Sequence, residues 1–282
     1  MAPRVITPVA PAPARAAPPA PRLLLPMLLL LAATATARAY NGLYCIHGLN
    51  DDASAFNGLR AWAAAAHPGQ VVEVYDGKEG PLSFEGLDAL VQDAEMRSAA
   101  FCRGGCTLVG HSQGGLIARA IAQRRRTNAT GLVSLAAPQQ GVCAIPPEWR
   151  PAWLPKRARE DLTALLYTSW AQNRLSVAGY WSDPEAAGFR TRLRALNAEP
   201  GGPLSHLRVA AFAGSESDEV LRPWQTSLWG EPRAGGGCAE VTNATGLLRG
   251  LHERLHLIHA RALRHGAWLR AEALNLLEPL LR

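Results

Sequence analysis

The stretch Gly-His-Ser-Gln-Gly-Gly at residues 110–115 follows a short apolar run, Thr107-Leu108-Val109, and opens a helical pattern that continues to Arg126. This order predicts a strand, a sharp turn and a helix, the context that a Gly-x-Ser-x-Gly nucleophile motif requires. Strain at such a turn pushes the Ser112 hydroxyl clear of the sheet, and the glycines let strand and helix approach closely. An ordinary Gly-Ser turn is the alternative, but it needs neither flanking element. We therefore expect Ser112 to be a nucleophile, with the backbone N–H of Gln113 directed at a carbonyl oxygen that acquires charge.

Residues 1–39 have the pattern of a cleaved signal peptide. Arginines without any acidic residue precede an apolar core, Leu23 to Leu31, and Ala37-Arg38-Ala39 supplies a small-x-small cleavage pattern. A membrane anchor is the alternative, but the apolar core is too short to span a bilayer. The sequence thus predicts export into the secretory pathway, no stable membrane insertion, and a single mature domain of residues 40–282.

Apolar strand patterns alternate with helical patterns through the mature chain. Strands are expected at 42–46, 71–75, 107–109, 132–135, 208–213 and 257–263, and helices at 51–67, 84–99, 115–126 and 267–281. Such alternation predicts an α/β fold with a mostly parallel sheet covered by helices on both faces. The last helix should present one apolar stripe, formed by Leu269, Ala273, Leu276, Leu277 and Leu280.

The pattern breaks between about residues 143 and 205, where prolines interrupt regular elements and tryptophans add apolar surface. A long aromatic insertion between sheet elements is typical of a lid and pocket wall, and a separate packing layer is the alternative. We expect a lid whose tryptophans, together with the apolar residues around Leu165, bind an apolar part of the substrate.

Charge and cysteine content exclude several functional classes. Loss of the four arginines in residues 1–39 lowers the formal net charge from +6 to +2, which argues against a nucleic-acid partner. The five cysteines match no zinc spacing, so no metal site is expected, and their odd number leaves at least one unpaired or buried. Asn128 and Asn243 begin Asn-x-Thr sequons and are predicted glycosylation sites.

A serine nucleophile needs a histidine base that an acid orients, and in this fold both follow the serine, with the acid first. His265 lies after the last expected strand and is the predicted base. His252, His256 and His259 lie in or before this strand and are expected to be structural. His111 precedes the nucleophile and is expected to point away from it, into the sheet layer.

The acid should lie in the loop after the 208–213 strand. This loop contains Glu216, Asp218 and Glu219. Asp218 is the predicted acid, with its two neighbours as competitors and a solvated acidic loop as the alternative. The second oxyanion donor, beside Gln113, is expected to be the backbone N–H of Leu49 at the end of the first strand.

Seven collinear segments extend through nearly all of the mature chain. They are Ile-His-Gly at 46–48, Gly-His-Ser-Gln-Gly-Gly at 110–115, Ser-Leu-Ala-Ala-Pro-Gln-Gln-Gly at 134–141, Tyr-Trp-Ser-Asp-Pro at 180–184, Leu-Asn-Ala-Glu at 196–199, Asp-Glu-Val-Leu-Arg-Pro-Trp-Gln at 218–225 and His-Gly-Ala-Trp at 265–268. Together they resemble a palmitoyl-protein thioesterase of the α/β-hydrolase fold. Many lipases share the serine motif, whereas the segments at 180–184 and 218–225 are far more specific.

The resemblance implies a catalytic triad of Ser112, Asp218 and His265 that needs no metal or cofactor. It also implies a lysosomal or vacuolar enzyme that cleaves long-chain fatty acyl thioesters, carried by proteins or by coenzyme A. The segments at 218–225 and 265–268 are more similar to the branch that prefers acyl-CoA-type thioesters.

Trp181 and Trp224 are expected to contact the acyl substrate. The chain departs from the family pattern in its five cysteines, onto which the usual disulfides do not map, and in His111, which is lipase-like. Two other functions remain open: a secreted lipase or carboxylesterase that uses the same triad on oxygen esters, and a hydrolase-fold binding protein without turnover.

Overall fold

The computed structural model describes residues 41–143, 164–183, 192–198, 204–233 and 246–281, so the predicted signal peptide lies outside the described residues. The described residues form a six-stranded parallel sheet in the order β2-β1-β3-β4-β5-β6. The strands are β1 (Gly42–Ile46), β2 (Val72–Val74), β3 (Cys106–His111), β4 (Ala129–Leu135), β5 (Val209–Ser215) and β6 (Leu255–Ala260). The predicted α/β class is confirmed.

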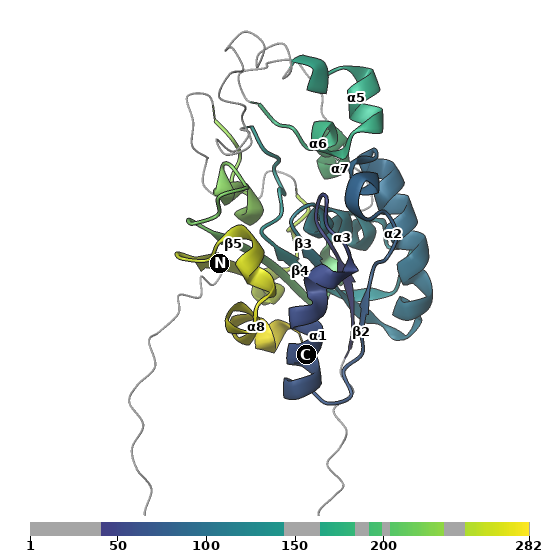
Figure 1. The fold of residues 1–282 in the computed structure, drawn as a ribbon, viewed down its shortest axis with the longest axis vertical. Helices are drawn as coiled ribbons and strands as arrows, with labels where there is room; N and C mark the ends of the chain where they lie inside the picture. The colour runs from purple at the N-terminus through teal and green to yellow at the C-terminus, as the bar shows by residue number, and fades with distance from the viewer. Residues whose placement is uncertain (1–40, 144–163, 184–191, 199–203, 234–245, 282) are drawn as a thin grey trace, which may run out of the picture.

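Helices cover both faces of the sheet (Figure 1). The four helices of these layers are α1 (Asn57–Ala66), α2 (Leu87–Phe101), α3 (Gln113–Arg124) and α8 (Ala271–Leu277). Along β1, Tyr44 and Ile46 pack with α2 and α3, whereas Leu43 and Cys45 pack with α1 and α8. Because successive side chains point to opposite faces and both faces are buried, the strands are continuous apolar runs in the sequence.

The C-terminal segment differs from the single helix that the sequence predicts. A 3₁₀ turn, His265–Leu269, is followed by an extended residue, Arg270 (φ −97°, ψ 157°), and only then by α8. Because Arg270 is extended, residues 265–277 do not form one continuous helix, and the expected apolar stripe is not continuous either. As a result Leu274 is fully buried, whereas Leu276, which was expected on the apolar stripe, is 47% exposed.

Parts of the expected insertion at 143–205 are described. They contain α5 (Ser169–Arg174), α6 (Ser176–Gly179) and α7 (Arg192–Ala198). These helices lie together beyond one end of the sheet (Figure 1). A parallel bridge between Val142 and Trp181 joins this segment to the loop after β4. Residues 144–163, with two more of the tryptophans, lie outside the described residues.

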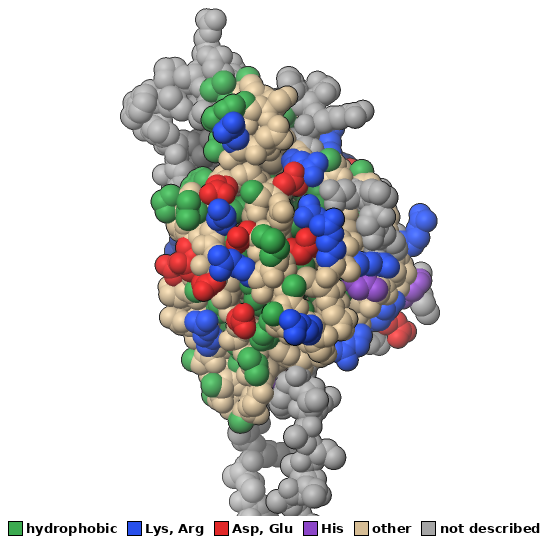
Figure 2. All heavy atoms as spheres, turned by 90° about the vertical axis from the view of Figure 1, so that its right-hand side faces the viewer, with side chains coloured by type: hydrophobic (Ala, Val, Ile, Leu, Met, Phe, Trp, Pro, Cys, Tyr) green, Lys and Arg blue, Asp and Glu red, His purple; other side chains and the backbone are tan. Residues whose placement is uncertain are grey.

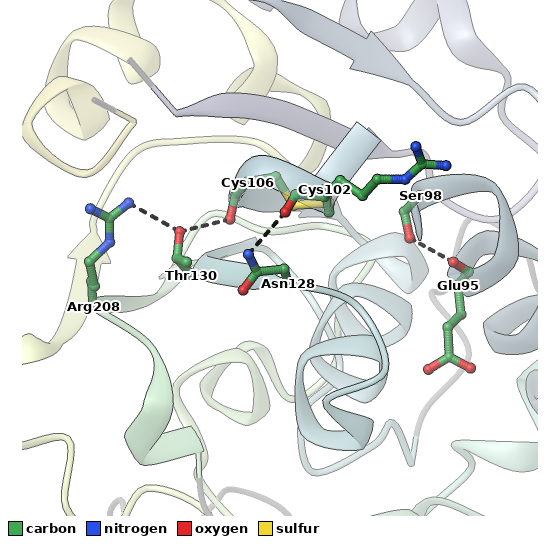
Figure 3. The surroundings of a disulfide bond; sticks show 8 residues. Glu95, Ser98, Cys102, Cys106, Asn128, Thr130 and Arg208 are labelled. Atoms are coloured by element: carbon green, nitrogen blue, oxygen red, sulfur yellow. Dashed lines mark hydrogen bonds between the residues drawn. A yellow bond between two sulfur atoms is a disulfide. The ribbon is translucent and has the colours of Figure 1, made fainter. Parts of the chain in front are cut away.

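Cys102 and Cys106 form a disulfide between the end of α2 and the start of β3 (Figure 3). The spacing of the cysteines alone left their pairing open. Beside the disulfide, the exposed side chain of Asn128 donates a hydrogen bond to the main-chain carbonyl of Arg103 over 3.2 Å. The second predicted glycosylation site, Asn243, lies outside the described residues.

Figure 2 shows the face over α2, where basic and acidic side chains are mixed. Arg97 pairs with Asp93 and Asp76, and Arg192 pairs with Asp88. Because these cations have acidic partners within the protein, this face carries no field of a single sign. Within the described residues, no helix has the length and apolar content needed to cross a bilayer.

Candidate active site

Ser112 lies between β3 and α3 at a positive φ of 54°, with ψ at −129°. Residues other than glycine rarely adopt this conformation, and it is held here by a hydrogen bond from the Ser112 N–H to the carbonyl of Leu135, at 2.8 Å. The turn also needs glycine at position 114, because a Cβ there would collide with the main-chain carbonyl oxygens of Ile46 and His47. The structure therefore contains the strand, tight turn and helix that the sequence predicts around Ser112.

Asp218 and His265 are brought together at the carboxyl ends of β5 and β6. The distances from Nδ1 of His265 to Oδ2 and Oδ1 of Asp218 are 2.8 and 3.0 Å, and both side chains are buried. Oδ1 also accepts the main-chain N–H groups of Val220 and Leu221, at 2.9 and 2.8 Å. This local turn directs the Asp218 carboxylate at the imidazole, and the carboxylate in turn fixes the orientation of the His265 ring.

The two competing acids have other partners. Glu216 pairs with Nε2 of His259 at 2.9 Å. Glu219 accepts the main-chain N–H of His265 at 3.0 Å and Nε–H of Arg264 at 3.2 Å. Burial acts to raise the pKa of Glu219, but these hydrogen bonds and the Arg264 charge outweigh it, so the pKa is lowered. The interpretation of a solvated acidic loop is therefore wrong for Glu219, which holds the backbone of His265.

His111 does not point away from the site, so this prediction is wrong. Its ring packs against the ring of His265, with centroids 4.8 Å apart, and its Nε2 donates to the main-chain carbonyl of His265 at 2.9 Å. β3 ends at His111, and the loop that carries His265 occupies the space beside this side chain. Burial is the main cause that lowers the pKa of His111 to about 3, and the charge of the neighbouring His265 is a smaller one. This imidazole therefore stays neutral.

A cavity of about 230 Å³ opens beside Ser112 and His265. Its remaining walls are mainly apolar, and they include Pro138, Val142, Val177, Tyr180, Trp181, Val220 and Leu221. Leu49 and Gln113, the predicted oxyanion donors, also line it. A Cβ built on Gly48 would lie 3.0 Å from the Cβ of Ser112, so the loop after β1 lies directly against the serine.

The two tryptophans expected to contact substrate lie in different places. Trp181 is buried in the cavity wall. The indole of Trp224 instead stacks on His259, with ring centroids 4.8 Å apart, and is not among the described residues of that wall. Among the described residues, no three His, Cys, Asp or Glu side chains are grouped so that they could hold a metal ion.

Sequence reasoning named two residues that contact His265 but missed their roles. His111 contacts the main-chain carbonyl of His265, and Glu219 contacts its main-chain N–H. Hydrogen bonds to backbone atoms leave no residue-type signal at the partner position. The one available signal was the adjacency of Glu219 to Asp218, since a loop that presents one carboxylate to a histidine brings its neighbours close.

The parallel sheet, the serine at the turn after β3 and the Asp–His pair beyond β5 and β6 define an α/β-hydrolase. Solved structures have the same fold. Bacillus licheniformis lipase BlEst2 superposes with a TM-score of 0.53 at 14% identity, covering 86% of this chain and 93% of that chain. The Paleococcus ferrophilus monoacylglycerol lipase superposes with a TM-score of 0.50 at 13% identity, covering 86% of this chain and 96% of that chain.

Sequence comparison narrows this class to one family. Residues 43–245 match the family model for palmitoyl protein thioesterase. Lysosomal thioesterase PPT2 of Homo sapiens is 33% identical over 228 residues, 74% of each chain. Palmitoyl-protein thioesterase 3 of Dictyostelium discoideum is 29% identical over 238 residues, 78% of this chain and 80% of that protein. The chain belongs to the palmitoyl protein thioesterase family, and it is an enzyme of thioester hydrolysis.

Proposed function

We propose that this enzyme hydrolyses long-chain fatty acyl thioesters with Ser112 as nucleophile, His265 as base and Asp218 as the orienting acid. The observation that supports this most is the buried hydrogen bond between Asp218 and His265, because His265 and Ser112 line the same apolar cavity. A serine hydroxyl is a weak nucleophile near neutral pH, so it needs such a base, and the base needs a fixed tautomer.

The mechanism follows from these positions. Nε2 of His265 takes the Ser112 proton as Oγ attacks the thioester carbonyl, and the N–H groups of Leu49 and Gln113 hold the oxyanion. The carbon–sulfur bond then breaks, and the imidazolium returns its proton to the departing thiol. Water activated by His265 adds to the acyl-enzyme, which releases the fatty acid and restores Ser112. Asp218 stabilises the imidazolium in both steps.

The cavity supports a long apolar acyl group. Val142, Val177 and Trp181 give it apolar walls, and Ser112 and His265 line the same cavity. We further propose a preference for acyl-CoA-type thioesters, on the similarity of 218–225 and 265–268 to that branch of the family.

We propose that the enzyme is exported and works in the lysosome. The lysosomal placement rests on the names of its relatives. Export rests on the signal-peptide pattern of residues 1–39, with cleavage after Ala39. N-terminal sequencing of the secreted or lysosomal protein should find Tyr40 or a residue close to it, whereas Met1 would contradict both proposals.

The test compares hexadecanoyl thioesters with oxygen esters of the same chain length. We expect the thioesters to be the better substrates. Ser112→Ala should remove several orders of magnitude of kcat without unfolding the protein, because a methyl group fits the same turn. An organophosphonate should label Ser112 in the native enzyme but not in the variant. Faster oxygen-ester hydrolysis would indicate a lipase or carboxylesterase, and an unlabelled, inactive native protein would indicate a binding protein.

A second comparison tests the thiol side of the substrate. Palmitoyl-CoA and a palmitoylated cysteine peptide carry the same acyl chain, so their ratio of kcat/KM isolates recognition of the thiol. A kcat/KM for palmitoyl-CoA above that for the peptide supports the acyl-CoA preference. A lower value for palmitoyl-CoA assigns the enzyme to acylated protein.

A further inference from the structure

A buried serine outside the proposed triad contacts both segments that carry the expected oxyanion donors. Ser83 lies in a 3₁₀ turn between β2 and α2 and is 2% exposed. Its hydroxyl accepts the main-chain N–H of Asn50 at 2.6 Å, and its main-chain carbonyl accepts Nε2–H of Gln113 at 2.8 Å. Asn50 directly follows Leu49, so a single residue joins the two donor segments.

The turn that carries Ser83 is itself attached to the loop after β1. The N–H of Gly80 donates to the carbonyl of Asp51 at 2.9 Å, and the Ser83 hydroxyl donates to the carbonyl of Gly80 at 2.6 Å. Asn50, whose N–H is hydrogen-bonded to Ser83, directly precedes Asp51 and has a φ of 55°. This conformation costs energy for residues with a Cβ, and asparagine tolerates it better than most. The Ser83 hydroxyl therefore holds the strained part of the loop in place.

We propose that Ser83 is a positioning residue that sets the main-chain N–H groups of Leu49 and Gln113 relative to each other for oxyanion binding. This inference rests on the proposed function, in which these two amides hold the oxyanion. Stabilisation of that charge needs donors preorganised at about 2.7–3.1 Å from the oxygen. Through its hydroxyl, Ser83 sets the loop that carries Leu49, and through its carbonyl it holds the first residue of α3.

Ser176 provides a matched control for this role. It is as deeply buried as Ser83, and its hydroxyl donates to the same Ser83 carbonyl at 3.1 Å. Ser176→Ala and Ser83→Ala each delete one buried hydroxyl, Ser176 from the main-chain carbonyl of Ser83 and Ser83 from Asn50 and Gly80. Only Ser83→Ala also leaves the Asn50 N–H without its acceptor, so a difference between the two variants isolates the attachment of the oxyanion loop.

The experiment measures kcat, KM and the affinity of two inhibitors on the full-length enzyme. A long-chain alkyl trifluoromethyl ketone adds to Ser112 and creates an oxyanion, whereas a non-hydrolysable thioether analogue of the substrate binds without one. We expect Ser83→Ala to lower kcat by about 10- to 100-fold, less than the loss of an entire donor. The affinity for the ketone should fall by a similar factor. The KM and the affinity for the thioether should change by less than about twofold, because binding of an uncharged ligand, before any oxyanion forms, is unaffected.

Ser176→Ala should leave all four quantities close to those of the native enzyme. The inference is overturned if Ser83→Ala keeps the native kcat, if it weakens the thioether and the ketone equally, or if Ser176→Ala causes the same loss of kcat. Ser83→Cys, nearly equal in size with a weaker acceptor, applies the same criteria if Ser83→Ala does not fold. A native enzyme without thioesterase activity overturns the proposed function, and this inference with it.

Discussion

Nε2 of His111 donates a hydrogen bond to the main-chain carbonyl of His265 over 2.9 Å, across a sequence separation of 154 residues. Glu219 accepts the main-chain N–H of the same histidine, and Asp218 accepts its Nδ1–H. His265 is therefore held at both main-chain polar groups and at one ring nitrogen. This arrangement leaves Nε2 as the ring nitrogen for the proton transfer with Ser112 that we propose.

The first prediction concerns stability and pH. Burial and the neighbouring His265 lower the pKa of His111 from 6.5 to about 3, so between these values the unfolded chain binds a proton that the folded chain does not. The free energy of unfolding should therefore fall as the pH falls through this window, with a contribution from His111 of up to about 1.4 kcal/mol per pH unit. His111→Gln keeps a hydrogen-bond donor but cannot be protonated, so its stability should depend less steeply on pH.

Urea unfolding at pH 6.5, 5.5 and 4.5 measures this slope. His252→Gln, at an exposed position, controls for the removal of a histidine. Equal slopes for the native protein and His111→Gln would show that His111 is not held neutral.

The second prediction separates the three carboxylates of the loop after β5. Asp218→Asn should lower kcat by about 10⁴-fold, because the amide no longer fixes the tautomer or stabilises the imidazolium. Glu216→Gln should change kcat by less than about tenfold, because Glu216 pairs with His259 at the exposed edge of β6. Glu219→Gln keeps an acceptor for the His265 N–H, so we also expect less than about tenfold there.

Steady-state kinetics and thermal unfolding of the three variants make this comparison. A crippling effect of Glu216→Gln, with Asp218→Asn active, would mean that the acid is assigned two residues too late.

The third prediction concerns acyl-chain length. Val177 lines the apolar cavity, so Val177→Trp should fill part of the space that a long chain would occupy. The kcat/KM for hexadecanoyl thioesters, relative to octanoyl thioesters, should fall by about tenfold or more. Val71→Trp is the control, because Val71 is 61% exposed and is not among the described residues of the cavity wall. An unchanged ratio in Val177→Trp would place the acyl chain elsewhere.

The fourth prediction concerns the disulfide. Cys102 and Cys106 close a short loop, for which the chain-entropy model gives a stabilisation of about 2 kcal/mol. Replacing both residues by alanine should therefore lower the free energy of unfolding by about this amount. The kcat should stay native, because the disulfide lies at the start of β3 and Ser112 follows its other end. A loss of activity without a loss of stability would contradict this separation.

Local sequence patterns correctly predicted the central strands and the turn at Ser112. The apolar runs that became β1, β3 and β4 are buried on both faces, and such strands keep their signal whatever their neighbours are. The glycines around Ser112 were equally informative, because Gly114 meets the carbonyls of Ile46 and His47 and no larger residue fits. The C-terminal helix was harder to predict, since its periodic leucines do not reveal that Arg270 is extended.

The sequence by itself determined the α/β class and the turn at Ser112, because both depend on residue types that lie close together along the chain. It also predicted the order of serine, acid and histidine, because this order follows from the fold class and from the loops in which the candidate residues stand. Only the tertiary structure decided which acid meets His265, where His111 points, and that Ser83 joins the segments of Leu49 and Gln113. These contacts join residues that are distant in sequence, and several of them end on backbone atoms. Residue identity does not encode such contacts, so they exist only once parallel strands bring their carboxyl ends to a common edge.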